Sequence, residues 1–465
     1  MGYSGSTRKS LSERQRTRRR EACAMSTQSA HDLKMLNAEM ACPVQVEDVD
    51  LFAPGSQEHW YEAYSLLHEQ APVLKIPGGG KLPGTDAYVI TKYADISRII
   101  RDPETFPPSD LRQASDEAAE IFRETGYGAP ADARQSLRPD LESHKQHRLQ
   151  LTDPWVGPVG AEQHADMIQS QVETLLDGWD SRTEAELVRE FAQPLPQRVI
   201  TTILGLPLED MPKLKAFEEA QVRRFVYFIN HRDELPPAEE IENAQALVEF
   251  QQYLKEQADE KRRNPGNDML SFLTQVEYEG RKLTDGEIVS VAFGMHIGGN
   301  ETTQFALTSE WLLLAQTPAI WAELKRDRSK VRFFVEEALR VYAPTQGSSS
   351  RLAARDVEFQ GMTIPAGSLL HVRYGAGNRD EDTFPQADSI DLARPNPGRH
   401  LTFSQGPRNC PGAGLSRLEQ NIAVNAWLDR FESIGLADGK NTFKHLPGRM
   451  FGLLELNVTF EPAAS

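Results

Sequence analysis

The segment 403–414, which reads FSQGPRNCPGAG, constrains the fold more than any other part of this chain. It predicts a glycine-rich turn followed by a helix over about 411–430, with Pro411 at the first helical position, where its missing N–H costs nothing. Cys410 would then lie at a helix N-terminus, where exposed N–H groups and the helix dipole favour the ionised thiolate. Gly406 permits the turn, and Gly412 and Gly414 allow a bulky flat group to approach the backbone. The alternative is a buried, unreactive thiol.

A second unusual pattern interrupts a helix that we expect over about 285–314. Residues 298–303 read GGNETT, and two glycines inside a helix destabilise it by roughly 2 kcal/mol. Without side chains, Gly298 and Gly299 leave space for a ligand against the backbone. Thr302 can bond a carbonyl four residues back and open a local bulge. The alternative is a kinked core helix with an exposed Glu301.

Two further pairs of charged residues have helical spacing. Glu337 and Arg340 share a helix face, and an exposed pair of this kind contributes less than about 1 kcal/mol. Their aromatic and aliphatic neighbours favour partial burial, with Arg394 as a candidate third member. His144 and Arg148, four residues apart, are suited to bind carboxylates, although such a pair often lies on a solvated face.

Charge and length limit the class of protein. The chain has 465 residues and a net charge of −17, which favours neither nucleic acid nor an anionic membrane as a partner. Residues 1–22 are basic, and we expect residues 1–45 to form a disordered extension, with Met25 as an alternative start. No stretch approaches the ~18 apolar residues of a spanning helix. Only three cysteines occur, so we expect no disulfide framework and a reducing cytoplasm.

Periodicity predicts a mostly helical chain. We expect a helix over 58–70, a strand pair at 72–76 and 87–91, and loop structure over 105–140. Helical periods dominate residues 160–340, and strand-like alternation follows near 351–375. Short strands are expected after residue 430, up to Phe460.

Together these motifs resemble those of the cytochrome P450 family. Residues 403–412 match its heme-binding pattern FxxGxRxCxG, and the chain also contains, in the expected order, its HxxxR, (A/G)Gx(D/E)T and ExxR motifs. The similarity covers roughly residues 46 to 463. It implies a mainly α fold with minor β structure, in which residues 46–465 form a single heme-enclosing domain.

The resemblance also implies roles for individual residues. Cys410 would be the axial thiolate ligand of iron, and Glu301 and Thr302 the acid–alcohol pair that delivers protons. Glu337, Arg340 and Arg394 would lock the proximal side. Loop 105–140 would cover the substrate, and His296 and Phe451 are candidates to face it. The remaining candidate cofactor-binding residues are His144, Arg148, Gly298, Gly299, Arg351, His400, Phe403, Arg408 and Gly412.

The implied activity is monooxygenation with heme b and O2. One oxygen atom would enter a small, largely apolar organic substrate by hydroxylation or oxidative demethylation. Electrons would come from a ferredoxin and an NAD(P)H-linked ferredoxin reductase, and the protein would be a cytoplasmic monomer of the bacterial type. Two alternatives remain: a peroxide-driven or rearranging heme-thiolate enzyme, and a non-catalytic heme-thiolate protein.

Overall fold

The computed structural model describes residues 41–53, 55–109, 115–129, 137–229, 232–233, 236–347, 350–446 and 450–463. Residues 1–40 of the expected extension therefore lie outside the described residues. Within the described residues, no helix combines the length and the apolar character needed to cross a membrane.

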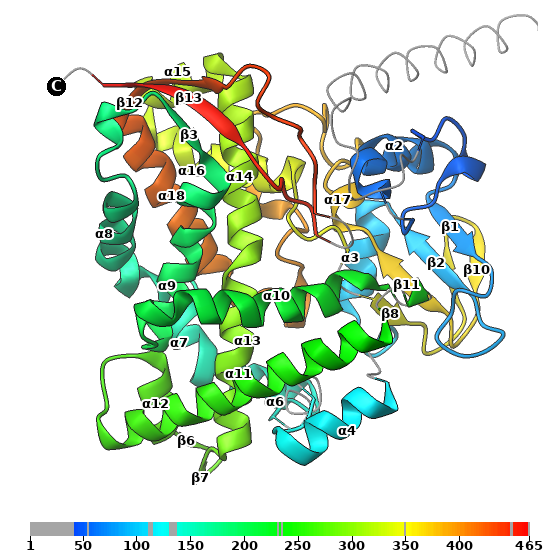
Figure 1. The fold of residues 1–465 in the computed structure, drawn as a ribbon. Coiled ribbons are helices and arrows are strands. Elements are labelled where there is room, and N and C mark those ends of the chain that lie inside the picture. The colour runs from blue at the N-terminus through cyan, green and yellow to red at the C-terminus, as the bar shows by residue number, and fades with distance from the viewer. Residues whose placement is uncertain are drawn as a thin grey trace, which may run out of the picture.

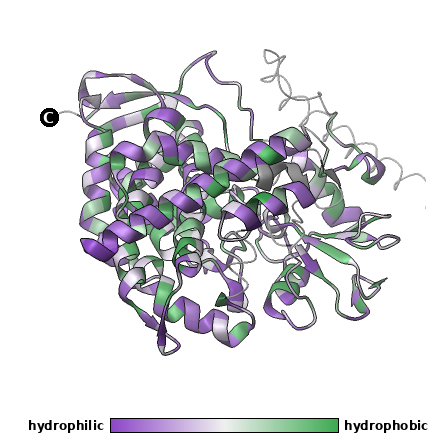
Figure 2. Ribbon diagram, turned by 60° about the horizontal axis from the view of Figure 1, so that its bottom comes forward, coloured by the Kyte–Doolittle hydropathy of each residue, from purple (hydrophilic) through white to green (hydrophobic). Residues whose placement is uncertain are grey.

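Helices make up most of the molecule (Figure 1). Their bounds are α2 Trp60–Gln70, α3 Tyr93–Arg101, α4 Asp116–Thr125, α6 Leu141–His147, α7 Asp153–Val156, α8 Ala165–Leu175, α9 Pro194–Leu204, α10 Met211–Tyr227, α11 Pro237–Arg263, α12 Met269–Gln275, α13 Asp285–Gly299, α14 Glu301–Gln316, α15 Pro318–Arg326, α16 Val331–Val341, α17 Tyr374–Gly377 and α18 Ala413–Arg430. Apolar and polar residues alternate along many of these helices, as Figure 2 shows, because one face of each packs into a shared core.

The strands form small sheets at the edges of the helical body. Their bounds are β1 Val73–Ile76, β2 Ala87–Ile90, β3 Glu184–Glu186, β4 Phe228–Ile229, β5 Arg232–Asp233, β6 Glu277–Tyr278, β7 Arg281–Lys282, β8 Ser350–Leu352, β9 Val357–Phe359, β10 Met362–Ile364, β11 Leu369–Val372, β12 Phe431–Leu436 and β13 Asn457–Pro462. The largest sheet has the order β1-β2-β11-β8, in which β2 and β11 are parallel and the other pairs antiparallel. This confirms the mainly α fold with minor β structure.

The long helix predicted over 285–314 is present as α13 and α14, and it crosses the middle of the molecule (Figure 1). Thr284 starts α13 with a capping box, since its hydroxyl accepts the N–H of Glu287 while the Glu287 carboxylate accepts the N–H of Thr284. Helix α11 packs against α13, and α10 against α11. The backbone between α13 and α14 breaks at Asn300, whose φ of −104° and ψ of −82° are not helical.

Two expectations for local structure are wrong. Residues 105–140 are not all loop, because Ser115 caps α4 by accepting the N–H of Ala118, and Phe122 buries its ring where α4 packs on α11. Residues 110–114 and 130–136 of this stretch lie outside the described residues. Pro411 is not the first helical residue, since α18 begins at Ala413 after Gly412.

Candidate functional site

The loop of Cys410 is held in place by its own backbone. The N–H of Cys410 donates to the carbonyl of Phe403 at 2.8 Å. Gly406 has a φ of +74°, and a Cβ there would come within 3.1 Å of the Arg101 Cα, so the prediction that this turn needs glycine is confirmed. A Cβ on Gly412 would meet nothing within 4 Å, which leaves open space beside Cys410.

Cys410 is a free cysteine whose sulfur receives the backbone N–H groups of Gly412 and Ala413. These contacts were expected, but they do not determine its ionisation. Burial raises the pKa of the Cys410 thiol, and this effect outweighs the N–H groups and the charges of Arg148 and Arg417. Such a thiol becomes an anion when a metal ion replaces its proton.

His144, Arg351 and Arg408 form a group of buried nitrogen donors beside this loop. His144 is buried; a weak contact to the Pro407 carbonyl raises its pKa, but neither ring nitrogen makes a hydrogen bond of good geometry to another described residue. Burial and the charges of Arg138, Arg408 and Arg148 lower its pKa to about 4. The Nε atom of Arg408 is also buried without an acceptor among the described residues.

Arg351, on β8, is almost fully buried, and burial together with the charge of Arg408 lowers its pKa. A group of buried donors and cations of this kind requires acceptors of negative charge. The two propionates of a heme are acceptors of that kind, so these residues fit the cofactor that the sequence predicts.

Two other predicted propionate ligands have different contacts. Arg148 donates from Nε to Asp153 at 2.7 Å and from Nη1 to the Asn409 carbonyl at 2.8 Å, so it ties its helix to the cysteine loop. His400 bonds the Glu336 carboxylate through Nε2 at 3.0 Å and the N–H of Thr402 through Nδ1. Both ring nitrogens of His400 therefore have protein partners, and its role as a propionate ligand stays a prediction.

Glu336 is a functional residue that the sequence reasoning missed. It lies next to the predicted ExxR pair, and its carboxylate binds both His400 and Arg417. Burial alone would raise its pKa, but these two partners lower it to about 2. Arg417 in turn lies 4.5 Å over the ring of Phe403, so this cluster connects α16 and α18 to the cysteine loop.

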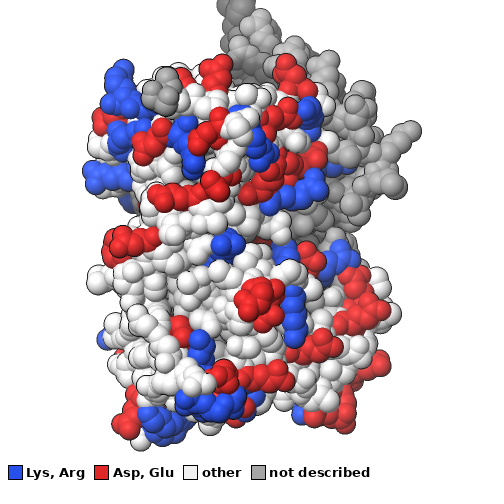
Figure 3. All heavy atoms as spheres, turned by 60° about the vertical axis from the view of Figure 1, so that its left-hand side comes forward, with Lys and Arg blue, Asp and Glu red and all other residues white. Residues whose placement is uncertain are grey.

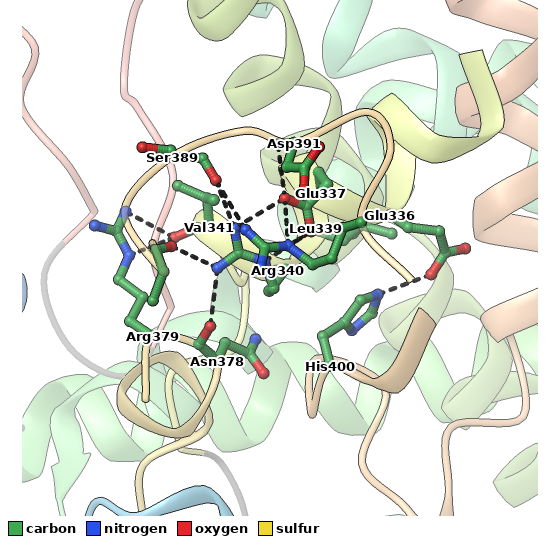
Figure 4. Close-up of polar contacts among 12 residues, drawn as sticks. Glu336, Glu337, Leu339, Arg340, Val341, Asn378, Arg379, Ser389, Asp391 and His400 are labelled. Atoms are coloured by element: carbon green, nitrogen blue, oxygen red, sulfur yellow. Dashed lines mark hydrogen bonds and ion pairs between the residues drawn. The ribbon is translucent and has the colours of Figure 1, made fainter. Parts of the chain in front are cut away.

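The ExxR pair lies in a fully buried network, shown in Figure 4. Arg340 donates to both Glu337 oxygens at 2.8 and 3.0 Å and to the carbonyls of Asn378 and Ser389. Arg394 donates to the same carboxylate at 2.9 and 3.0 Å, which confirms it as the third member. The exposed alternative for this pair is wrong, because neither Glu337 nor Arg340 is exposed.

The break between α13 and α14 has the predicted threonine contact. Thr302 donates from its hydroxyl to the Gly298 carbonyl at 3.0 Å. A Cβ on Gly298 would meet nothing within 4 Å, whereas a Cβ on Gly299 would lie 3.1 Å from Ile200 on α9. Only Gly298 therefore provides open space for a ligand. Gly299 permits close packing of two helices, and its role as a cofactor-binding residue stays a prediction.

Glu301 is neither exposed nor isolated. It is only 8% exposed, and its carboxylate lies 3.4 Å from the ammonium group of Lys215 on α10. Burial raises the pKa of Glu301, although the charge of Lys215 acts in the opposite direction. No sequence pattern pointed to Lys215, which is 86 positions away from Glu301.

Two candidates to face the substrate are buried among aromatic rings. The ring of Phe451 contacts Trp60, Tyr61 and Tyr342 in the core near the N-terminal helix α2. His296 is fully buried and meets the Phe250 ring of α11 edge-on at 5.2 Å.

Comparison with known proteins identifies the family. Residues 112–460 match the family described as Cytochrome P450. The chain is 30% identical over 402 residues to "Biotin biosynthesis cytochrome P450" of Bacillus subtilis (strain 168), an alignment that covers 86% of this chain and 96% of that protein. It is 32% identical over 381 residues to "Nocardicin C N-oxygenase" of Nocardia uniformis subsp. tsuyamanensis, covering 81% and 89%.

Solved structures agree with the sequence comparison. The structure of P450BioI in complex with hexadec-9Z-enoic acid ligated acyl carrier protein superposes with a TM-score of 0.75 at 29% identity, covering 87% of this chain and 98% of that one. A mutant of P450 EryK in complex with erythromycin B gives 0.72 at 26% identity, covering 87% and 97%. With its cysteine loop, its ExxR network and its threonine-bonded helix break, this chain belongs to the cytochrome P450 family of monooxygenases.

Proposed function

We propose that this protein is a heme-thiolate monooxygenase with heme b, in which Cys410 is the iron ligand. When bound, the heme supplies the binding and activation of O2. The observation that carries the proposal is the set of buried, unbonded nitrogens of His144 and Arg408 beside the cysteine loop, which would bind the propionates together with Arg351. Phe403 and Gly412 would border the cofactor on the thiolate side.

Thr302 and Glu301 would deliver the two protons that O2 reduction to water requires. The Thr302 hydroxyl lies at the helix break and donates to the carbonyl of Gly298, the residue whose missing side chain leaves open space. From there the hydroxyl would hold a hydrogen bond to a reacting oxygen atom. Glu301, the residue before Thr302 in α14, would supply protons to this hydroxyl.

The Thr302 role has a direct test. Thr302→Ala should consume electrons with less product and more hydrogen peroxide, because proton delivery fails while reduction continues. Unchanged coupling would reject the role.

The substrate would be a largely apolar organic molecule with a polar handle. Two relatives of this chain are named "Vitamin D(3) 25-hydroxylase" and "Nocardicin C N-oxygenase". Two similar structures contain hexadec-9Z-enoic acid, ligated to acyl carrier protein, and erythromycin B. These molecules differ in shape, so they support a broad class and no single substrate. Hydroxylation and oxidative demethylation both stay within this proposal.

Electrons would come from a ferredoxin and its NAD(P)H-linked reductase, which we expect to dock on the cysteine side through exposed basic residues such as Arg101 and Lys145. On the face shown in Figure 3, acidic and basic side chains are interspersed. The monomeric state, the cytoplasmic location, the lack of a nucleic-acid or membrane partner, and the domain boundaries 1–45 and 46–465 stay predictions.

A ligand library tests the substrate class. Each compound, including hexadec-9Z-enoic acid and vitamin D(3), is added to the ferric protein, and the Soret band is followed for the change in spin state that accompanies loss of the iron-bound water. We expect apolar compounds with one polar group to give saturable shifts. Shifts given only by small polar compounds would contradict the proposed class, and product formed with hydrogen peroxide faster than with ferredoxin and O2 would favour the peroxide-driven alternative.

A further inference from the structure

A buried polar cluster, which we call the Lys215 cluster, lies between α10 and the break that separates α13 from α14. It consists of Lys215, Glu218, Asn300 and Glu301. The Lys215 ammonium lies 3.2 Å from Glu218 and 3.4 Å from Glu301, so one cation bridges two carboxyl groups. The Asn300 side-chain amide donates to the same Glu218 oxygen that Lys215 contacts. Asn300, at which the helix breaks, therefore also binds the Glu218 carboxyl group.

The charges of this cluster do not balance if both carboxyl groups are ionised. Glu218 is fully buried, and Lys215 is the cation that both carboxylates contact. Burial, with a further contribution from the charge of Glu301, raises the pKa of Glu218 to about 8. Two buried carboxyl groups on one lysine therefore favour a cluster in which one carboxyl group keeps its proton beside the protonated lysine.

The charged groups around the cluster support this reading. Glu219, the exposed neighbour of Glu218, raises the pKa of both Lys215 and Glu301 by its negative charge. His296 on α13 does not compete for the proton, because burial and the charge of Lys215 lower its pKa to about 4. Two buried oxygens, Glu218 Oε1 and Asn300 Oδ1, make no hydrogen bond to another described residue, so the cluster has free acceptor atoms.

The cluster has two ends. At one end the Lys215 side chain is 19% exposed, which gives the buried carboxyl groups a partner that reaches water. At the other end Glu301 is followed directly by Thr302, whose hydroxyl contacts the helix break. Lys215 lies between Glu218, which is fully buried, and Glu301.

We propose that Glu218, held by Asn300 and Lys215, keeps a proton in reserve and returns it to Glu301 after Glu301 has given its own proton to Thr302. This inference rests on the proposed function, and it assigns to Glu218 a positioning and relay role. One turnover converts O2, the substrate C–H group, two electrons from the ferredoxin and two protons into the hydroxylated product and water. The proton leaves the Glu218 carboxyl group, reaches the Glu301 carboxylate through the Lys215 ammonium, and is replaced on Glu218 from water.

Infrared titration of the ferric holoenzyme tests the reserve proton without turnover. Spectra of the wild type, Glu218→Gln and Glu219→Gln are compared as the pH rises from 6 to 9. We expect the wild-type minus Glu218→Gln difference to contain a protonated-carboxyl band that disappears with a midpoint near pH 8, as the raised pKa of Glu218 requires. Glu219→Gln removes the same charge one position along the helix and should keep this band. An identical titration of Glu218→Gln and the wild type would overturn the proposal.

A second variant keeps the test decisive if Glu218→Gln fails to fold. Lys215→Gln removes the cation that lowers the pKa of both carboxyl groups, so the midpoint of the band should move to higher pH. An unchanged midpoint in Lys215→Gln would also overturn the proposal.

A turnover assay then distinguishes failure of the Glu218 relay from failure of the proposed monooxygenase function. With reduced ferredoxin and O2, Glu218→Gln should release a several-fold larger fraction of the consumed O2 as hydrogen peroxide than Glu219→Gln does, most strongly above pH 7. Oxidation of guaiacol by added hydrogen peroxide needs no relay and should not change. If every variant shows the thiolate spectrum with carbon monoxide and the peroxide fraction is equal, only the relay is wrong. If the wild type lacks that spectrum, the proposed function itself fails.

Discussion

Replacing Glu337 by glutamine removes one carboxylate from between two buried guanidinium groups. Glu337 and Arg340 have no exposed surface, and Arg394 is only 6% exposed. Four hydrogen bonds of 2.8–3.0 Å join the two arginines to this carboxylate, and the N–H of Asp391 adds a fifth. Glutamine has nearly the same shape, so the variant changes charge and hydrogen bonding more than packing.

The expected loss is large. Removing one partner of a buried ion pair costs about 3–5 kcal/mol, because the remaining charge stays buried without compensation. The free energy of unfolding of a domain is only about 5–15 kcal/mol, so Glu337→Gln should lose a third of it or more. Because the network joins α16 to the segment before the cysteine loop, the variant should also retain less heme.

The matched control is Glu260→Gln. Glu260 forms the same i, i+3 pair with Arg263, but the two side chains are 48% and 65% exposed. Because solvent screens this exposed pair, its loss should leave the free energy of unfolding almost unchanged. Urea unfolding of both variants, followed by tryptophan fluorescence and heme absorbance, measures the difference. A loss below about 1 kcal/mol for Glu337→Gln would refute the reasoning.

The loss should also depend on pH. Burial alone would raise the pKa of Glu337, but the hydrogen bonds and charge of Arg340 outweigh burial and lower it. A carboxyl group with a lowered pKa in the folded state stabilises the protein above its ordinary pKa, and this contribution disappears as the pH falls through the lowered value. The difference between the wild type and Glu337→Gln should therefore shrink in acid.

Three further changes test other parts of the site. His144→Phe removes a donor to a propionate, and a hydrogen bond to a charged group contributes about 1.5–3 kcal/mol. Heme transfer from this variant to apomyoglobin should therefore be roughly 10- to 100-fold faster than from the exposed control Lys145→Met. Equal transfer rates would contradict the propionate role. Gly299→Ala should lower the free energy of unfolding by about 1–3 kcal/mol through crowding of Ile200, whereas Gly298→Ala, in open space, should not, and the reverse order would refute the packing argument. Burial and the charge of Glu336 raise the pKa of Glu310 well above its ordinary value, so the wild type loses stability as the pH rises above about 4.3. Relative to the wild type, the free energy of unfolding of Glu310→Gln in urea should therefore increase by up to about 1.4 kcal/mol per pH unit. A difference that does not change with pH would contradict this.

Motifs whose members lie close in sequence were predicted well. The helix break, the Thr302 bond to the Gly298 carbonyl and the Glu337–Arg340 pair all follow from spacings of three or four residues. Arg394 was also predicted, but only through the family resemblance.

Contacts between distant segments were not predictable from spacing. Lys215 meets Glu301 across 86 positions, and Glu336 meets Arg417 across 81, and neither pair leaves a local signal. His400 was predicted from its position before the cysteine loop, yet its orientation depends on Glu336, which lies on another helix. Helix α4 was missed because the Pro, Asp and Ser content of 105–140 suggested a loop, while Ser115 in fact caps a helix.

The central claim is a bond between the Cys410 sulfur and heme iron, and one spectrum tests it most directly. The purified protein is reduced, carbon monoxide is added, and the Soret band is recorded for the wild type and for Cys410→His. We predict the strongly red-shifted band of thiolate-ligated iron for the wild type and its loss in the variant. A wild-type protein that binds no porphyrin, or that gives the band of histidine-ligated iron, would contradict the claim.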